Sequence, residues 1–187
     1  MKMGRLPNKF FQRDVLQVAP ELLGKILVRR FADGTEKRYA ITEVEAYRGA
    51  EDLACHAAKG RTPRTEIMFA EGGRVYVYFI YGMYWLLNFV TSTAGNPQAV
   101  LIRGIEGFPG PGRVGRELQL DKSFYSENLG ISTRLWIENA PAIVNYQIST
   151  RIGVNYAGDK WAGKPWRFLT QCTSKTKSNK HLHKKKN

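Results

Sequence analysis

The chain has 187 residues, a length that fits one domain built around a single hydrophobic core. Lys and Arg number 29 against 16 Asp and Glu, which gives a formal net charge of +13. A surplus of this size attracts polyanions, so nucleic acid is the first class of partner to consider.

The cysteines and the hydropathy of the chain indicate in which cellular compartment the protein works. The two cysteines, Cys55 and Cys172, form no CxxC pair, which argues against a disulfide framework and a zinc ribbon. Residues 1–11 lack an apolar stretch of signal-peptide length, and the longest apolar run, around residues 75–90, is interrupted by Gly82. We therefore expect no membrane partner and a cytoplasmic, nucleoid-associated or nuclear location.

The C-terminal segment differs in composition from the rest of the chain. Residues 173–187 include six lysines and almost no apolar anchor, which predicts a disordered basic tail behind a single domain over residues 1–172. The lysines could contact phosphates without regard to sequence, or could simply keep the protein in solution. His181 and His183 have no acidic or Cys partners nearby, so no metal site is expected.

The first half of the chain predicts a helix, an antiparallel hairpin of two strands, and a long irregular loop with at most one short helix. The expected bounds are Val15–Leu23, Lys25–Phe31, Lys37–Tyr47 and Arg48–Glu71. Asp14 is the expected N-cap, and Pro20 is expected to start a second short turn. A loop this long within a compact domain is usually functional.

The second half predicts a hairpin rich in aromatic residues and then shorter elements. Two apolar runs meet at Tyr81-Gly82, and a Gly/Pro-rich turn precedes a short helix from Arg113. The expected bounds are Arg74–Ile80, Met83–Val90, Val100–Glu106, Leu135–Ile137 and Ile143–Val154 for strands, Gly107–Gly112 for the turn, and Asp159–Gly163 for a helical turn. The fold class is therefore α+β: a curved, mainly antiparallel sheet with flanking short helices and a protruding aromatic β-hairpin.

An acidic and an aromatic residue stand together at the end of the second expected strand. Side chains alternate across a strand, so one face should carry Tyr39, Ile41, Glu43, Glu45 and Tyr47. On a surface strand, a Glu can pair with a Lys across the sheet while a Tyr covers apolar area. The same strand, however, leads into the long loop, and sites are often assembled where strands end.

His56, in the long loop, is the only histidine outside the tail. A single His is more often structural than catalytic. Its neighbour Cys55 could form a nucleophilic Cys–His pair only if both side chains pointed the same way, and adjacent residues of an extended chain point apart. We expect Cys55 to be a small buried residue.

The hairpin carries more aromatic side chains than one sheet face needs. An exposed Tyr at a Gly turn, as at Tyr81, is a candidate wedge for a stack of bases in a basic protein. Tyr76, Tyr84 and Trp85 are instead expected to belong to an aromatic core whose hydroxyls reach solvent.

Taken in order and spacing, these residues resemble the alkyladenine (3-methyladenine, methylpurine) DNA glycosylase family. The resemblance extends from about Phe10 to Phe168, and its combination of short motifs is far more specific than any one of them. The matching segments are Glu43–Tyr47, Glu51-Asp52, His56, Arg61–Arg64, Met68-Phe69, Tyr76–Tyr84, Asn88, Val100–Arg103, Gly110–Gly112, Arg151–Val154, Ala157-Gly158 and Lys164–Phe168.

The resemblance implies a role for each matched residue. Glu45 would be the general base that activates water against the sugar C1′ of a damaged purine flipped from the duplex, and Arg103 would help to hold that water. The residues implied for the base pocket are Tyr47, His56, Tyr78 and Asn88, and Tyr81 would fill the gap left in the duplex. The residues implied for contacts to the DNA backbone are Arg61, Thr62, Arg64, Met83 and Tyr84.

The resemblance further implies a monofunctional base-excision-repair glycosylase that acts on 3-methyladenine, hypoxanthine or ethenoadenine types of lesion. Its partner would be double-stranded DNA containing damaged purines, and it would work as a monomer without metal or organic cofactor. No lysine lies near Glu45 in the matched motif, so a Schiff-base step is not indicated.

Three positions depart from the family pattern. In the helix Arg113–Leu118 the family more often has Leu and Ala at the second and fifth positions, where this chain has Val114 and Glu117. Cys55 before His56 is the third variation.

Two other classes of function are compatible with the charge and the aromatic residues. One is a nucleic-acid-binding module without catalysis, for which Glu45 would be dispensable. The other is an enzyme that acts on free nucleosides, for which Tyr81 would be dispensable.

Overall fold

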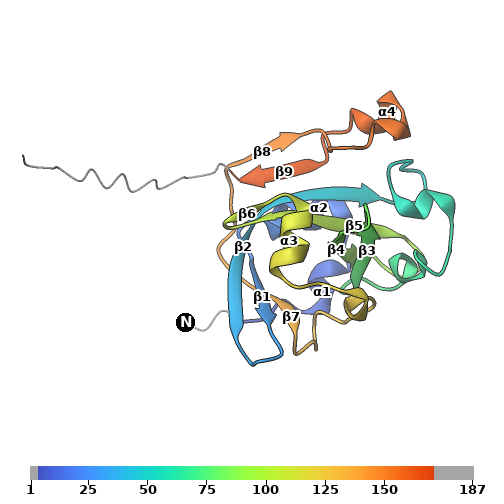
Figure 1. The fold of residues 1–187 in the computed structure, drawn as a ribbon. Coiled ribbons are helices and arrows are strands. Elements are labelled where there is room, and N and C mark those ends of the chain that lie inside the picture. The colour runs from blue at the N-terminus through green and yellow to red at the C-terminus, as the bar shows by residue number, and fades with distance from the viewer. Residues whose placement is uncertain (1–3, 171–187) are drawn as a thin grey trace, which may run out of the picture.

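One long strand, β2 (Glu36–Arg48), organises the sheet in the computed structural model, which describes residues 4–170 (Figure 1). It pairs antiparallel with β1 (Ile26–Arg30), β5 (Gln98–Ile105) and β9 (Arg167–Thr170). The main path of the sheet runs β3-β4-β5-β2-β1-β7. The expectations for the tail, including Cys172 and both tail histidines, lie outside the described residues.

The remaining strands are short, and every pairing between strands is antiparallel. They are β3 (Val75–Ile80), β4 (Tyr84–Thr91), β6 (Phe108–Pro109), β7 (Leu135–Glu138) and β8 (Tyr146–Ser149). The helices are α1 (Asn8–Phe11), α2 (Val15–Leu22), α3 (Pro111–Glu117) and α4 (Asp159–Ala162), with 3₁₀ turns at His56–Lys59, Glu66–Phe69, Lys122–Phe124 and Asn155–Ala157. The predicted α+β fold with a mainly antiparallel sheet is confirmed.

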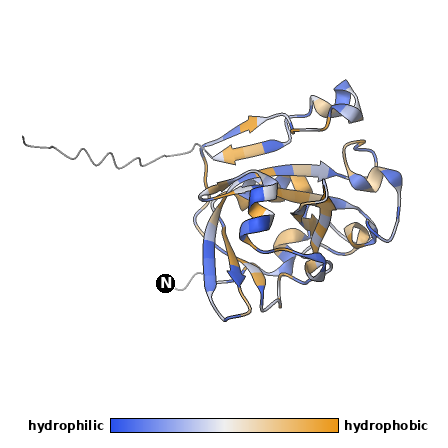
Figure 2. Ribbon diagram, in the orientation of Figure 1, coloured by the Kyte–Doolittle hydropathy of each residue, from blue (hydrophilic) through white to orange (hydrophobic). Residues whose placement is uncertain are grey.

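The core lies between the helices and one face of the sheet. Leu22 of α2 and Val114 of α3 are fully buried in one cluster with Val44 of β2 and Val100 of β5. Figure 2 shows hydrophobic residues concentrated in the central strands, with hydrophilic residues toward the hairpin end of β1 and β2. The β8–β9 hairpin joins the sheet through the pairing of β9 with β2, and with α4 it lies at the top of the view in Figure 1.

A β-bulge in β2 changes which side chains face the core. The register against β5 shifts between Ile41 and Glu43 and again between Glu43 and Val44. Tyr39 and Ile41 therefore share the core face with Val44, whereas Glu45 points to the other face. The prediction that Tyr39 and Ile41 share a face with Glu45 is wrong, because one extra residue in a bulged strand inverts the alternation beyond it.

Several element boundaries also differ from expectation. Pro20 lies inside α2 rather than at the start of a second turn, and the helix ends two residues later, at Leu22. The predicted N-cap is confirmed, since the Asp14 carboxylate accepts from the Leu16 N–H at 2.9 Å. The long loop contains two 3₁₀ turns instead of one helix.

The expected strand over residues 143–154 is wrong over most of its length. Only Tyr146–Ser149 forms a strand, because its pairing partner is the four-residue strand β9. Both α1 and β9 were absent from the sequence prediction, since each is too short to show a period. In the described part of the chain, no helix is long and apolar enough to cross a membrane.

Helix α3 packs unusually close to β4 because Gly115 has no side chain. A Cβ atom at this position would lie 1.8 Å from the carbonyl oxygen of Trp85. Glu117, which departs from the family pattern in this helix, accepts hydrogen bonds from Tyr39 and Lys37 of β2.

We expect Gly115→Ala to lower the free energy of unfolding by at least about 3 kcal/mol, because backbone rather than a movable side chain blocks the new methyl group. Urea unfolding followed by circular dichroism measures this loss. Gly4→Ala is the control, since a Cβ there meets nothing within 4 Å. Equal stability of the two variants would contradict the close approach of α3 to β4.

Candidate active site

Glu45 is a carboxylate with no exposed surface, on the face of β2 turned away from the helical core. One oxygen, Oε1, accepts from the Ile152 backbone N–H at 2.8 Å, and Oε2 accepts from the Tyr47 hydroxyl at 2.8 Å. An Arg103 guanidinium nitrogen lies 3.4 Å from Oε1. In place of the lysine expected on a surface strand, Glu45 thus has two buried hydrogen-bond donors and the charge of Arg103.

The environment of Glu45 acts on its proton affinity in two directions. Burial raises the pKa of Glu45, while the Arg103 charge and the two hydrogen bonds partly oppose that rise. A carboxylate whose pKa is raised accepts a proton more readily, while the Arg103 charge and the two hydrogen bonds favour its ionised form. Glu45 is therefore suited to act as a general base.

Glu43, also on this face, orients the arginine beside Glu45. Its Oε1 accepts from Arg103 Nε at 3.1 Å and from Arg167 at 2.9 Å. Arg103 lies where β5 is irregular opposite the bulge of β2, between the pairs Gly104–Glu43 and Ile102–Val44. The bulge thus brings Glu43, Glu45 and Arg103 together.

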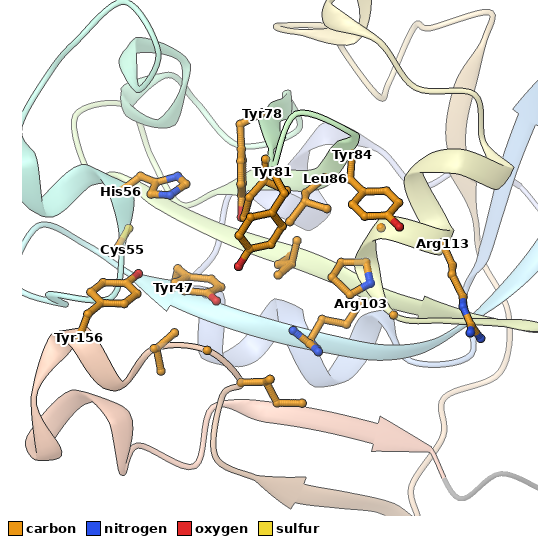
Figure 3. A pocket seen from close by; sticks show the side chains of 18 of the residues that line it. Tyr47, Cys55, His56, Tyr78, Tyr81, Tyr84, Leu86, Arg103, Arg113 and Tyr156 are labelled. Carbon is orange, nitrogen blue, oxygen red and sulfur yellow. The ribbon is translucent and has the colours of Figure 1, made fainter.

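A cavity of about 810 Å³ lies beside these groups, and aromatic and basic side chains form much of its wall. Tyr47, His56, Tyr78 and Tyr81 point toward a common space from β2, the long loop and the β3–β4 hairpin (Figure 3). A smaller chamber of about 40 Å³ has Tyr47, His56, Tyr78 and Asn88 in its wall. The four residues predicted for the base pocket are thus brought together.

Tyr47 connects the carboxylate to the cavity. It lies in the wall of both cavities while its hydroxyl donates to Glu45. Burial and the nearby Glu45 carboxylate raise the pKa of Tyr47 well above the ordinary value, so the hydroxyl remains a donor.

His56 is a neutral, partly buried ring on the opposite side of the cavity. Its Nδ1 lies 2.8 Å from the Tyr76 hydroxyl, and its ring meets the Tyr78 ring edge-on at 4.6 Å. Burial, with the charges of Arg64 and Lys59, lowers the pKa of His56 to about 4. Tyr76 belongs to the core, as predicted, but the prediction that its hydroxyl reaches solvent is wrong, because the residue is buried and the hydroxyl meets His56.

Asn88 forms part of the floor of the smaller chamber. It is buried on β4, and its side-chain Nδ2 donates to the Tyr76 carbonyl oxygen at 3.1 Å. This bond fixes the amide plane. The amide therefore presents a fixed polar edge to whatever enters the chamber.

Tyr81 occupies a strained turn at the tip of the β3–β4 hairpin. Tyr81 and Gly82 have φ angles of 54° and 66°, and the Met83 N–H donates to the Ile80 carbonyl at 3.1 Å, as in a type I′ turn. Tyr81 is 81% exposed, and Met83 is exposed beside it. A bulky residue at positive φ costs free energy, so the turn holds this exposed aromatic ring at the tip against a conformational cost.

The other residues predicted to contact a DNA backbone differ in their surroundings. Arg64 and Tyr84 lie in the wall of the large cavity, and the Arg64 guanidinium lies 4.9 Å from the centroid of the Tyr78 ring. Arg61 instead forms an ion pair with Glu66 at 2.9 Å. Thr62 is exposed, and its hydroxyl and N–H bond to Thr65. These four residues therefore do not form one cluster.

Sequence reasoning missed two residues of the site. Tyr156 is 70% exposed, lies in the wall of both cavities and donates its hydroxyl to the Ala54 carbonyl at 3.1 Å. Arg151, quoted only as part of a matching segment, is buried against Tyr47. The exposed aromatic beside Ala157-Gly158 was the one available signal for Tyr156; nothing local marked Arg151.

Buried, neutral His56 makes stability depend on pH. Its pKa of about 4 lies below the ordinary 6.5, so between these values the unfolded chain binds the proton more strongly and stability falls as the pH falls. The loss attributable to His56 between pH 7.5 and pH 4 is on the order of 3 kcal/mol. We expect His56→Gln to flatten the pH dependence of unfolding by that amount in urea titrations. An unchanged slope would mean that His56 has the same pKa in the folded and the unfolded chain.

Comparison with known proteins places the chain in a family. The sequence model described as "Methylpurine-DNA glycosylase (MPG)" matches residues 9–109 and 107–174. A protein of Methanocella arvoryzae is 40% identical, with 92% of this chain and 97% of the relative covered. Relatives from Legionella pneumophila (strain Corby) and Sodalis glossinidius are 43% and 44% identical, covering 89% and 87% of this chain and 94% and 95% of their own lengths.

All three relatives bear the name "Putative 3-methyladenine DNA glycosylase". The family match covers nearly all of the described residues, including every residue that forms the cavity beside Glu45. The chain belongs to the methylpurine-DNA glycosylase family.

Proposed function

We propose that this protein hydrolyses the N-glycosidic bond of alkylated or deaminated purines in duplex DNA, of the 3-methyladenine, hypoxanthine and ethenoadenine type. The observation that carries this proposal is Glu45, a buried carboxylate held by two hydrogen bonds and the charge of Arg103 beside a cavity with tyrosine walls. The family match and the names of the relatives support the same chemistry.

The chemistry requires a carboxylate at this position. Departure of a purine leaves positive charge on the sugar, which a nearby carboxylate stabilises while it takes a proton from the attacking water. Glu45 would do both. Arg103, held by Glu43 at 3.1 Å, would orient the water, and the Ile152 N–H would keep Oε1 in place.

The aromatic walls would hold the extruded base. Extrusion from the duplex costs a few kcal/mol, and stacking on an aromatic face returns about 1–3 kcal/mol per base. Tyr47 on one side and His56 with Tyr78 on the other provide such faces, and electron-rich rings favour bases that alkylation has made cationic. The fixed amide of Asn88 would disfavour the exocyclic amine of normal guanine.

The hairpin would act on the duplex itself. Tyr81 would fill the gap that the base leaves, entering from the minor groove, with Met83 and Tyr84 against the neighbouring backbone. Arg64, Arg61 and Thr62 would add phosphate contacts. Because residues of one chain complete the cavity, we propose a monomer as the working form.

Glu45→Gln separates a glycosylase from a module that only binds DNA. We expect turnover of duplexes containing ethenoadenine, hypoxanthine or methylated adenine to fall at least about 10²-fold, with lesion binding within severalfold, because the amide keeps the shape but accepts no proton. Release of abasic product under single-turnover conditions measures the rate. Glu21→Gln, a surface carboxylate paired with Arg13, should be fully active.

Undiminished turnover by Glu45→Gln would exclude it as the base. Folded, unmodified protein that releases none of the three bases would refute the glycosylase itself.

Lys59 also lies in the cavity wall, so the absence of a lyase step is tested separately. Trapping of a protein–DNA adduct by borohydride would contradict a monofunctional enzyme.

Tyr81→Asn should move stability and activity in opposite directions. Asn tolerates the φ of 54°, so we expect a gain of about 0.5–1 kcal/mol in unfolding free energy, whereas loss of the ring should cut duplex turnover at least about tenfold. Gln119→Asn, at another positive φ away from the cavity, is the matched control and should leave turnover unchanged. Full activity of Tyr81→Asn would favour an enzyme of free nucleosides.

A further inference from the structure

A buried ion pair lies behind the base pocket. The Arg151 guanidinium and the Asp52 carboxylate meet through two contacts of 2.5 Å and 2.9 Å, and neither side chain has any exposed surface. This bidentate geometry satisfies both carboxylate oxygens and two guanidinium nitrogens at once. This ion pair has no part in the roles proposed above, which are those of the general base, the stacking faces and the wedge.

The pair joins three segments of the site. Arg151 also donates to the carbonyl oxygens of Ala46 on β2 and Trp161 on α4, both at 3.1 Å. Asp52 accepts from the backbone N–H groups of Arg48 and Ala54, each at 3.1 Å, and so fixes the start of the long loop. The charged groups are therefore rigidly placed.

The Arg151 charge lies against the ring of Tyr47. Its guanidinium carbon is 4.8 Å from the centroid of that ring and 5.0 Å from the Trp166 ring. Tyr47 lies in the wall of the cavity, whereas Arg151 is fully buried, so the guanidinium occupies the face of Tyr47 turned away from the cavity. A base stacked on Tyr47 would have this ion pair directly behind the ring.

We propose that the Arg151–Asp52 pair determines how strongly the pocket prefers cationic over neutral purines, by keeping the charge behind Tyr47 compensated. The inference rests on the proposed function and deepens it. An aromatic face attracts a cation through its electrons, and a second cation on the opposite face opposes that attraction. Asp52 cancels the opposing charge, so the front face of Tyr47 still favours a cationic base.

The size of the effect follows from the separation. A base stacked about 3.5 Å in front of Tyr47 has its charge roughly 8 Å from the guanidinium. At an effective dielectric constant of about 20, an unbalanced unit charge at that distance shifts binding by more than tenfold. Arginine stays charged in proteins, so the loss of Asp52 leaves a full positive charge behind the ring.

The test compares a cationic with a neutral lesion in one duplex sequence. Single-turnover kcat/KM is measured for 3-methyladenine, which is cationic in the duplex, and for hypoxanthine, and the ratio of the two values is the readout. We expect Asp52→Asn to lower this ratio at least about tenfold and Arg151→Gln to raise it about threefold. Misfolding lowers both rates together, so shifts of opposite sign identify an electrostatic role.

Glu127→Gln is the matched control. Glu127 pairs with Arg134 at 2.7 Å, and the Arg134 guanidinium lies 4.2 Å from the centroid of the Phe124 ring, a similar arrangement whose residues are not among those of either cavity wall. The ratio of kcat/KM for the cationic lesion to that for the neutral lesion should be the same in Glu127→Gln as in the unmodified protein. A shift like that of Asp52→Asn would show a general charge effect and overturn the proposal.

Arg151→Lys is the variant to use if circular dichroism shows that Asp52→Asn and Arg151→Gln do not fold. It keeps a buried ion pair with Asp52 and is therefore expected to fold. A compact ammonium lies nearer Asp52 and no longer lies flat on the ring, so the ratio should rise at least about twofold. A ratio unchanged in every folded variant, or shifted the same way by Asp52→Asn and Arg151→Gln, overturns the proposal. An unmodified protein that releases neither of these bases nor ethenoadenine would instead refute the proposed function.

Discussion

The extra residue in β2 is the constraint on which the rest of the site depends. Without the bulge near Glu43, strict alternation would put Glu45 on the same side as Ile41, inside the apolar core, where an ionised carboxylate has no donors. With it, Glu45 and Tyr47 leave the core and meet groups from β5 and from the segment after β8. A local backbone irregularity thus provides a polar face on a strand that is apolar on its other side.

This polar face is held together by a chain of charges. Glu43 binds Arg103 and Arg167, Arg103 reaches Glu45, and the bidentate pair of Asp52 and Arg151 lies behind Tyr47. Each buried charge in this series has an opposite partner, which low-dielectric surroundings require. The site is rigid for the same reason, because moving one member would leave another uncompensated.

The sequence predicts the elements that have a clear period or a clear start, such as the capped helix after Asp14 and the hairpin that turns at Gly82. It predicts the members of the base pocket only through the resemblance to a family, because local pattern alone allows Glu45 to be an ordinary surface residue. The bulge and the role of Arg151 lie beyond such reasoning. Both depend on pairing with residues distant in the chain, and no window of neighbouring residues contains that information.

Cys55, a departure from the family pattern, lies in the wall of both cavities next to His56. Burial raises the pKa of its thiol to about 12, so the sulfur is a thiol rather than a thiolate at neutral pH. The electrophiles that methylate purines attack thiolates far more readily than thiols. Burial therefore keeps the sulfur in this wall in its less reactive form, beside the aromatic faces of the pocket.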